Sequence, residues 1–264
     1  MNVFNLSFGK DSMATLILAA EQGIPIDRVM YCEIKFNDEI SGEHPLMAEW
    51  IPTAEKRLKE LFGVTVDHAY CGYTFCDEFY RKMKKGKFIG IIRGFPMVQG
   101  AWCNSMKVIA SRKYYKQFNE PVTEVMGIAY DEMKRWERAL QRQTKNRIAR
   151  SLLVEQKLTE EDAFEICKKY DLLSPIYTSS DGIYRGGCWF CPKQCMADLR
   201  ALWENYPQLY NKLVEMEKDT VTTFRPDKVT LKTMSERFEK GYTPQRRKKQ
   251  NKYKQMSLFD KEDK

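Results

Sequence analysis

The chain lacks any apolar run of about 18 residues, which is the length that a membrane-spanning helix needs. It also lacks the basic segment and apolar stretch of a secretory signal, because a strand-like apolar run begins already at Val3. We therefore expect a cytoplasmic protein with no membrane partner. In that reducing compartment, the eight cysteines are expected to be metal ligands, redox groups or buried side chains rather than disulfides.

Histidine is also scarce, since His44 and His68 are the two histidines in a chain of 264 residues. Zinc chemistry based on histidine ligands is therefore not expected. Apolar residues are plentiful: 43% of the chain is hydrophobic and 12% aromatic, which predicts a folded protein rather than a disordered one. The length allows a sizeable core in one domain, or in one domain with an appendage.

The net charge of +8 is concentrated at the C-terminus. Residues 240–264 hold nine Lys and Arg against three acidic residues, which leaves +2 for residues 1–239. Such a tail is either a solvated solubilising segment or an electrostatic arm for nucleic acid. Because the sequence from position 241 on is polar and has no apolar periodicity, we expect a flexible tail.

A polar loop, Ser7-Phe8-Gly9-Lys10-Asp11-Ser12, lies between a strand-like run and a helix-like run. In such a unit, backbone N–H groups and the positive end of the helix converge on an anion. Gly9 allows close approach of the backbone, Lys10 adds positive charge, and Ser7 and Ser12 add hydroxyl donors. The loop is therefore predicted to hold phosphate. The alternative is a serine-capped helix with a chance Gly-Lys pair.

This loop is not a Walker A motif. That motif has a glycine five residues before its Gly-Lys pair and a Ser or Thr directly after the pair. Here Phe4 and Asp11 occupy those two positions.

Strand-like runs alternate with helical patterns through the first two thirds of the chain. Strands are predicted at residues 3–6, 29–32, 64–66 and 124–128, and a helix at residues 45–62. This alternation predicts an α/β fold with a parallel sheet, whose ligands bind at the carboxyl ends of the strands.

The later segments are predicted to be loop-rich and then helical. Residues 72–100 hold five glycines and one proline and are expected to form a lid or an insertion. Helices are predicted at residues 155–170, with Thr159 as N-cap, and at residues 203–216. Residues 220–238 are ambiguous.

The pattern Ser-x-Gly-Lys-Asp-Ser resembles the PP-loop of the adenine nucleotide α-hydrolase superfamily, which includes ATP pyrophosphatases and phosphoadenosine phosphosulfate (PAPS) reductases. Further segments follow the order seen in the PAPS reductase-like family. They are Ser41-Gly42-Glu43-His44-Pro45 with Trp50-Ile51, Trp102-Cys103-Asn104-Ser105-Met106-Lys107-Val108, Gly127-Ile128-Ala129-Tyr130-Asp131-Glu132 with Arg135, and Ser174-Pro175-Ile176-Tyr177 leading through Tyr184-Arg185-Gly186-Gly187 to Cys188-Trp189-Phe190-Cys191-Pro192.

The resemblance implies a parallel-sheet, Rossmann-like adenine nucleotide α-hydrolase core with a helical, cysteine-containing C-terminal part. The expected division is a nucleotide-binding domain with the cysteine cluster at residues 1–200, a helical extension at residues 201–239 and a disordered basic tail at residues 240–264.

The chain departs from the family pattern in three places. Phe8 stands where many members have glycine, and Ala129 stands where arginine is usual. The Glu-Cys-Gly-Leu-His segment that carries the attacking cysteine of true PAPS reductases has no match, because the last cysteine is Cys195. Direct reduction of PAPS to sulfite is therefore not the first expectation.

The resemblance also implies a site for ATP or PAPS with Mg²⁺. The implied nucleotide-binding residues are Ser7, Gly9, Lys10, Asp11, Ser12, Lys107, Gly127, Asp131, Glu132 and Arg135. Lys10 and Asp11 are the catalytic candidates, since Lys10 would neutralise a leaving pyrophosphate and Asp11 would hold the metal or cap the helix. The alternative for Lys107 and Arg135 is that they are helix-surface side chains.

Three cysteines, Cys188, Cys191 and Cys195, have the spacing C-x₂-C-x₃-C, and the resemblance implies Cys103 as a fourth ligand. Four thiolates hold either a [4Fe–4S] cluster or Zn²⁺. Analogy with adenosine phosphosulfate (APS) reductases and DNA phosphorothioation enzymes favours iron–sulfur, although those APS reductases have two adjacent cysteines where this chain has Trp102-Cys103. A further alternative for C-x₂-C is a redox pair. The remaining cysteines are predicted to be small buried side chains: Cys32, Cys71, Cys76 and Cys167.

The tail segment Gln255-Met256-Ser257-Leu258-Phe259 resembles the peptide by which bacterial DNA-metabolism proteins bind the β sliding clamp. Met256, Leu258 and Phe259 are apolar anchors suited to a groove, and the basic stretch before them would favour nearby DNA. The alternative is a chance pentapeptide, or one that docks back on the body.

Three functions fit these patterns. The first is an enzyme that binds ATP, releases pyrophosphate and activates a substrate as an adenylate for sulfur transfer, with DNA or another nucleic acid as acceptor. The second is a sulfonucleotide reductase acting on PAPS or APS. The third is a non-catalytic nucleotide sensor or clamp-associated DNA-binding module.

Overall fold

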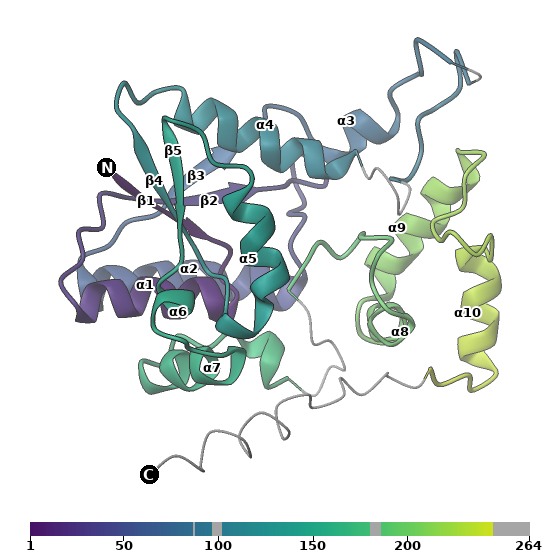
Figure 1. Ribbon diagram of the computed structural model, residues 1–264. Helices are drawn as coiled ribbons and strands as arrows, with labels where there is room; N and C mark the ends of the chain where they lie inside the picture. Colours follow the sequence, from purple (N-terminus) through teal and green to yellow (C-terminus); the bar gives the residue numbers. More distant parts are fainter. Residues whose placement is uncertain (87, 97–101, 180–185, 245–264) are drawn as a thin grey trace.

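A parallel β-sheet organises the molecule (Figure 1). The computed structural model describes residues 1–86, 88–96, 102–179 and 186–244. Within these residues, five parallel strands form one sheet of order β3-β2-β1-β4-β5. The strands are β1 (Asn2–Leu6), β2 (Arg28–Glu33), β3 (Asp67–Tyr70), β4 (Val122–Met126) and β5 (Arg147–Arg150). The predicted α/β parallel-sheet fold is therefore confirmed.

The strand order reverses direction between β1 and β4. The chain adds β2 and β3 on one side of β1, then returns to place β4 and β5 on the other side. The loops that follow β1 and β4 therefore lie side by side at the carboxyl edge of the sheet, with their helices leading to opposite sides. Such a topological switch point is where open parallel sheets bind their ligands.

Helices cover both faces of the sheet (Figure 1). One layer consists of α1 (Lys10–Glu21), α2 (Pro45–Phe62), α6 (Leu152–Glu155), α7 (Glu160–Lys169) and the 3₁₀ turn η2 (Pro175–Tyr177). The other begins with α3 (Phe75–Phe79) and α4 (Cys103–Tyr115) and continues into α8 (Met196–Asn205), α9 (Pro207–Lys218) and α10 (Leu231–Glu239). The 3₁₀ turn η1 (Tyr130–Glu132) and α5 (Met133–Leu140) connect β4 to β5.

The strand side chains alternate between two apolar cores, one on each face. Val3 and Met30 join the core formed with α3, α4 and α8–α10, whereas Phe4 and Val29 join the core formed with α1, α2 and α7. This period of two is what a sheet buried on both faces requires. The helices α8–α10 share one core with α4 and the sheet, and α8 itself crosses position 200. The division of the chain at residues 200 and 239 remains a prediction.

Several element boundaries are those that the sequence predicted. The helix predicted at residues 45–62 has these bounds, with Pro45 in its first turn and Gly63 ending it at a φ of 67°. Thr159 caps α7 as predicted, because its side chain accepts from the Asp162 N–H while the Asp162 carboxylate accepts from the Thr159 N–H.

Four predicted boundaries were wrong. Residues 64–66 are not a strand, because the Val64 N–H closes the end of α2 on the Leu58 carbonyl and β3 follows at Asp67–Tyr70. The strand predicted at residues 124–128 starts and ends two residues earlier, at Val122–Met126. The helix predicted at residues 155–170 begins only at Glu160, as α7, and Glu155 is the last residue of the separate helix α6. The helix predicted at residues 203–216 is two helices, since Pro207 begins α9 directly after Tyr206.

None of the helices in the described ranges is both long enough and apolar enough to cross a membrane. The residues with the clamp-like pattern, 255–259, and most of the basic tail lie outside the described residues, as do Tyr184 and Arg185.

Candidate functional site

The loop of residues 7–12 joins β1 to α1 at the carboxyl edge of the sheet. Phe8 has a φ of 55°, a left-handed conformation that glycine adopts without strain and an aromatic residue rarely does. Its ring is fully buried and packs edge-on against Tyr31 and Trp50, with centroids 5.1 and 6.2 Å away. Position 8, where the family pattern has glycine, therefore has a left-handed backbone conformation, and the packing of the Phe8 ring offsets the strain of that conformation.

Hydroxyl groups close the loop on itself. The Ser7 N–H donates to Ser12 Oγ over 3.1 Å, and the two hydroxyl oxygens lie 3.0 Å apart. Ser12 Oγ also donates to the Gly9 carbonyl over 3.0 Å. The predicted hydroxyl donors thus hold the loop in shape in the ligand-free protein.

Lys10 is the charged centre of the loop. Its ammonium lies 2.7 Å from Asp11 Oδ1 and 3.1 Å from Glu160 Oε2, with 13% of the Lys10 side chain exposed. Burial lowers the pKa of Lys10, but the hydrogen bonds and charges of Asp11 and Glu160 outweigh that effect and raise it above its usual value. The ammonium therefore stays charged across the physiological range.

Asp11 shares this environment. Burial raises the pKa of the Asp11 carboxyl above its usual range, the Lys10 ammonium opposes that shift, and the negative charges of Glu160 and Glu132 add to it. Two carboxylates, Asp11 and Glu160, therefore contact the lysine, and Glu132 is near enough to affect Asp11.

Gly127 brings the β4 end directly against the loop. A β-carbon on Gly127 would lie 2.3 Å from the backbone nitrogen of Ser12, so no other residue fits without moving the backbone. On the same connection, Asp131 accepts a hydrogen bond from the Glu160 N–H over 3.3 Å, and Glu132 lies close enough to affect Asp11. The predicted residues of the two segments, 7–12 and 127–132, do meet at one edge.

Sequence reasoning missed three residues of this site, all from later in the chain. Glu160, at the start of α7, pairs with Lys10; Tyr177 accepts the Lys10 N–H through its hydroxyl at 3.3 Å; and the Cys167 thiol donates to the Lys10 carbonyl at 3.1 Å. Glu160 had one visible signal, since it is an acidic residue in the first turn of a well-capped helix. Cys167 is fully buried, as predicted.

Two other predicted nucleotide-binding residues lie elsewhere. Arg135 is an exposed residue of α5 that pairs with Glu132 at 2.7 Å. Lys107 is an exposed residue of α4 that lies near Glu43 and Cys188. Contact of either residue with nucleotide remains a prediction.

The cysteine segment packs against the Ser41–Pro45 turn. Glu43 and Cys188 form a β-bridge, and the Trp189 N–H donates to the Gly42 carbonyl over 3.2 Å. Gly42 has no room for a side chain, because a β-carbon there would lie 2.4 Å from the Ile34 carbonyl oxygen. Two segments that resemble the family pattern are therefore in contact, although about 145 residues separate them in the sequence.

Three of the four predicted cysteine ligands share one neighbourhood. The Cys191 N–H donates to the Cys188 carbonyl over 3.0 Å and forms a tight turn. Burial raises the pKa of the Cys188 thiol, and the charges of Glu43, Cys191 and Cys103 raise it further. Burial, followed by the charge of Cys191, raises the pKa of Cys103. Cys195 is exposed, and its sulfur accepts the Asp198 N–H at the start of α8.

The donor chemistry of this group fits a soft metal or an iron–sulfur cluster, but the thiols are not assembled around one point. Among the described residues, no three Cys, His, Asp or Glu side chains converge as metal ligands. Ligation by Cys103, Cys188, Cys191 and Cys195 therefore remains a prediction. Of the cysteines predicted to be buried, Cys71 and Cys167 are buried, whereas Cys32 and Cys76 are half-buried.

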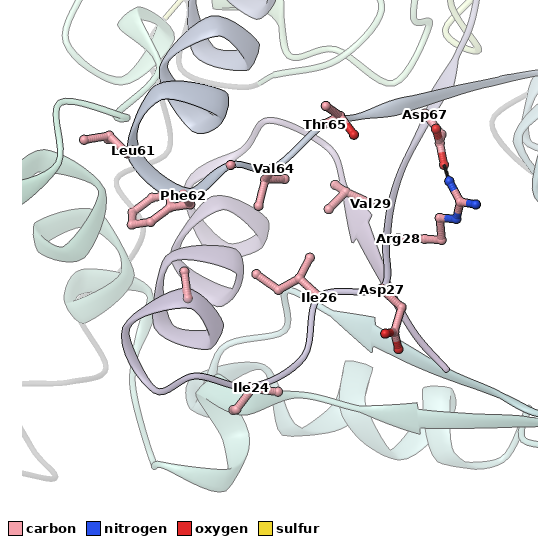
Figure 2. Close-up of a pocket in the computed structure, with 12 residues that line it drawn as sticks. Ile24, Ile26, Asp27, Arg28, Val29, Leu61, Phe62, Val64, Thr65 and Asp67 are labelled. Carbon is pink, nitrogen blue, oxygen red and sulfur yellow. Dashed lines mark ion pairs between the residues drawn. The ribbon is translucent and has the colours of Figure 1, made fainter.

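A separate cavity of about 540 Å³ lies at the opposite edge of the sheet (Figure 2). It opens where β2 and β3 begin and is lined by Ile24, Ile26 and Val64, with the Arg28–Asp67 pair on one side. Because parallel sheets bind ligands at the carboxyl ends of their strands, we do not assign the nucleotide to this cavity.

The chain matches no protein-family model and no curated protein sequence. Among solved structures, it is similar to the U34-tRNA thiolase NcsA from Methanococcus maripaludis, determined with its [4Fe–4S] cluster. The likeness covers 90% of this chain and 71% of that chain, with 14% sequence identity and a TM-score of 0.38. A likeness at this level leaves the function to be argued from the residues of this chain.

Proposed function

We propose that the chain is an ATP-dependent enzyme that adenylates a substrate, releases pyrophosphate and so activates the substrate for sulfur transfer. The observation that carries the proposal is the contact between Gly127 and the 7–12 loop at the switch point of the sheet. Lys10, the backbone amides at the start of α1 and the carboxylates of Asp11 and Glu132 belong to this same edge of the sheet, which supports the proposal.

The proposed reaction needs negative charge to be stabilised on a departing group. An oxygen of the substrate bonds to the α-phosphorus of ATP, the bond from that phosphorus to the bridging oxygen breaks, and pyrophosphate leaves with the bonding electrons. Lys10 and the amides at the N-terminus of α1 would stabilise that charge. Asp11 and Glu132 offer the carboxylate oxygens that Mg²⁺ accompanying ATP prefers.

Nucleotide binding would change the partners of Lys10. Its ammonium donates to Asp11 and Glu160, which leaves one N–H for a phosphate, and a second contact to phosphate would release one of these carboxylates. Binding of Mg²⁺ to the released carboxylates would compensate for the exchange. The nucleotide and its metal are therefore expected to bind together more tightly than either does alone.

The cysteines enter the proposal as a second centre. Cys103, Cys188, Cys191 and Cys195 would hold a [4Fe–4S] cluster, with Zn²⁺ as the alternative, and the cluster would supply a site where sulfur binds. Anaerobic purification followed by a visible spectrum and metal analysis separates the two metals. A brown protein that contains iron supports the cluster, and a colourless protein with one zinc supports the alternative.

Pyrophosphate release tests the activity itself. The protein, purified anaerobically, is incubated with Mg²⁺ and ATP, so that water takes the place of the substrate oxygen and ATP yields AMP and pyrophosphate; both products are quantified for the wild type, Lys10→Ala and Lys59→Ala. Lys59 is an exposed residue of α2 and serves as the matched control. We expect release by the wild type and the control and its loss in Lys10→Ala. Release of sulfite from PAPS with a thiol, without pyrophosphate from ATP, would replace this proposal by the reductase function.

A further inference from the structure

The helix α5 is unusual in that none of its residues is buried. It begins at Met133, directly after Glu132 of the candidate site, and then runs beside β5 (Figure 1). A helix that contributes nothing to a core gains little from packing, and its surface is free to serve another purpose.

Positive charge is concentrated on this helix and on the turn after it. Lys134 and Arg138 are four residues apart and so lie on one face, about 6 Å along the helix axis. Arg142 and Lys145 continue the basic series in the turn before β5, and all four side chains belong to exposed residues. Glu137 is the one acidic residue of α5.

These four cations have no acidic partner in the described part of the chain. The neighbouring ion pairs use other residues: Arg135 pairs with Glu132, Arg147 with Glu124 and Arg150 with Glu155. Repulsion among unpaired cations is unfavourable until anions approach them. The series therefore differs from a surface face of alternating charges, which would neutralise itself.

Exposed apolar side chains accompany the charges. Met133 and Leu140, at the two ends of α5, are each 39% exposed, and Ile148 on β5 is 49% exposed. Cations interspersed with apolar contact area suit a polynucleotide, which presents regularly spaced phosphates together with base and sugar surfaces.

We propose that α5 and the turn after it, through Lys134, Arg138, Arg142 and Lys145, bind the phosphate backbone of a nucleic acid. The helix begins at the candidate nucleotide site, so a strand held along it would extend toward the carboxyl ends of β1 and β4. The substrate that is adenylated and receives sulfur is accordingly a nucleic acid. This conclusion rests on the proposed function, whereas the existence of the binding surface does not depend on it.

Paired charge reversals test this surface in the full-length protein. The test variant is Lys134→Glu/Arg138→Glu/Arg142→Glu. The control, Lys59→Glu/Lys212→Glu/Lys232→Glu, makes the same change in net charge at exposed lysines of α2, α9 and α10. Because both variants keep residues 245–264, any binding by the tail is common to both. The probes are labelled single-stranded RNA, single-stranded DNA and duplex DNA, followed by fluorescence anisotropy from 50 to 300 mM salt.

We expect the test variant to bind at least one probe about tenfold or more weakly than the control at 100 mM salt. The slope of log K against log salt should fall by about 2, since each lost phosphate contact removes about 0.7 to 0.9. The three probes identify which polynucleotide is bound. Equal binding by the two variants, or no binding of any probe by the wild type, would overturn the proposal, as would binding to anionic lipid vesicles alone.

The same variants separate this inference from the proposed function. ATP binding and pyrophosphate release use Lys10, so titration with ATP should be unchanged in the α5 variant. Lost oligonucleotide binding with intact ATP binding supports the surface. If the α5 substitutions weaken oligonucleotide binding but the wild type neither binds nor cleaves ATP, the nucleic-acid surface is supported and the adenylation reaction is refuted.

Discussion

Gly127, at the end of β4, leaves no space between itself and Ser12, in the first turn of α1. A β-carbon on Gly127 would lie 2.3 Å from the Ser12 nitrogen and 2.4 Å from its α-carbon. Glycine is thus required by close approach of two backbones rather than by its own dihedral angles. This contact fixes the distance between the 7–12 loop and the loop that follows β4.

Gly127→Ala should therefore separate the β4 loop from the 7–12 loop. We expect a loss of about 2 to 4 kcal/mol in the free energy of unfolding, typical of a steric conflict in a packed region, together with loss of ATP binding. Urea denaturation and calorimetry measure the two effects. Gly186→Ala is the control, because its new β-carbon would meet only Met47, at 4.0 Å. Similar stabilities for the two variants would contradict the contact.

At Phe8, substitution by glycine should destabilise the protein less than substitution by alanine. Phe8→Ala loses the buried ring but keeps a side chain at a φ of 55°, whereas Phe8→Gly loses the ring and relieves the backbone strain. Both variants should lose about 2 to 5 kcal/mol, and the glycine variant should be the more stable by about 1 kcal/mol. Urea midpoints at equal m-values would show this order, and the reverse order would refute the strained conformation.

Glu160 competes with phosphate for the ammonium of Lys10, 3.1 Å away. Glu160→Gln removes one negative charge facing the incoming nucleotide, so ATP binding without Mg²⁺ should tighten about fivefold, corresponding to about 1 kcal/mol. Glu161→Gln changes an exposed neighbour on the same helix end and should have little effect. Calorimetric titrations in EDTA compare them. Equal affinities for the two variants would show that Glu160 does not restrain Lys10.

Thiol reactivity should differ sharply between Cys167 and Cys195. Burial, followed by the charge of Asp11, raises the pKa of Cys167 to about 12, so about one thiol in ten thousand is ionised at pH 8. Because this pKa is raised, the buried thiol favours the fold below the unfolded pKa near 9, and that contribution is lost as the pH rises toward 12. Cys195 is exposed.

Iodoacetamide at pH 8 followed by peptide mass spectrometry measures this difference in the metal-free protein. Cys195 should be alkylated within minutes and Cys167 only after denaturation in urea. Alkylation of the two cysteines at equal rates in the native protein would mean that Cys167 is not enclosed behind the loop.

The sequence predicted the centre of the sheet better than its edges. The strands β1, β2 and β4 are covered on both faces, so their apolar runs are visible in the sequence. By contrast β3 and β5 are the two edge strands, and their sequences, Asp67-His68-Ala69-Tyr70 and Arg147-Ile148-Ala149-Arg150, resemble no apolar run. Pairing with β2 and β4 makes these segments strands, and a local pattern does not contain that information.

The site divides in the same way. The loop of residues 7–12 and the 127–132 segment could be predicted because each is a contiguous stretch of sequence that resembles a family pattern. Glu160, Cys167 and Tyr177 reach Lys10 from more than 140 positions away, by the packing of α7 and η2 on α1, and no spacing rule connects them. Likewise, the strain at Phe8 is visible only once the backbone is known.

The most direct test of the account is whether Lys10 binds the phosphates of ATP. The full-length protein, purified under anaerobic conditions, is titrated with Mg²⁺ and ATP in a calorimeter, beside Lys10→Ala and the control Lys59→Ala. We predict saturable binding by the wild type and the control, and an affinity about 30-fold or more lower for Lys10→Ala, as expected for loss of a charge-assisted phosphate contact of about 2 kcal/mol. Absence of ATP binding by the wild type, or equal binding by Lys10→Ala, would contradict the account.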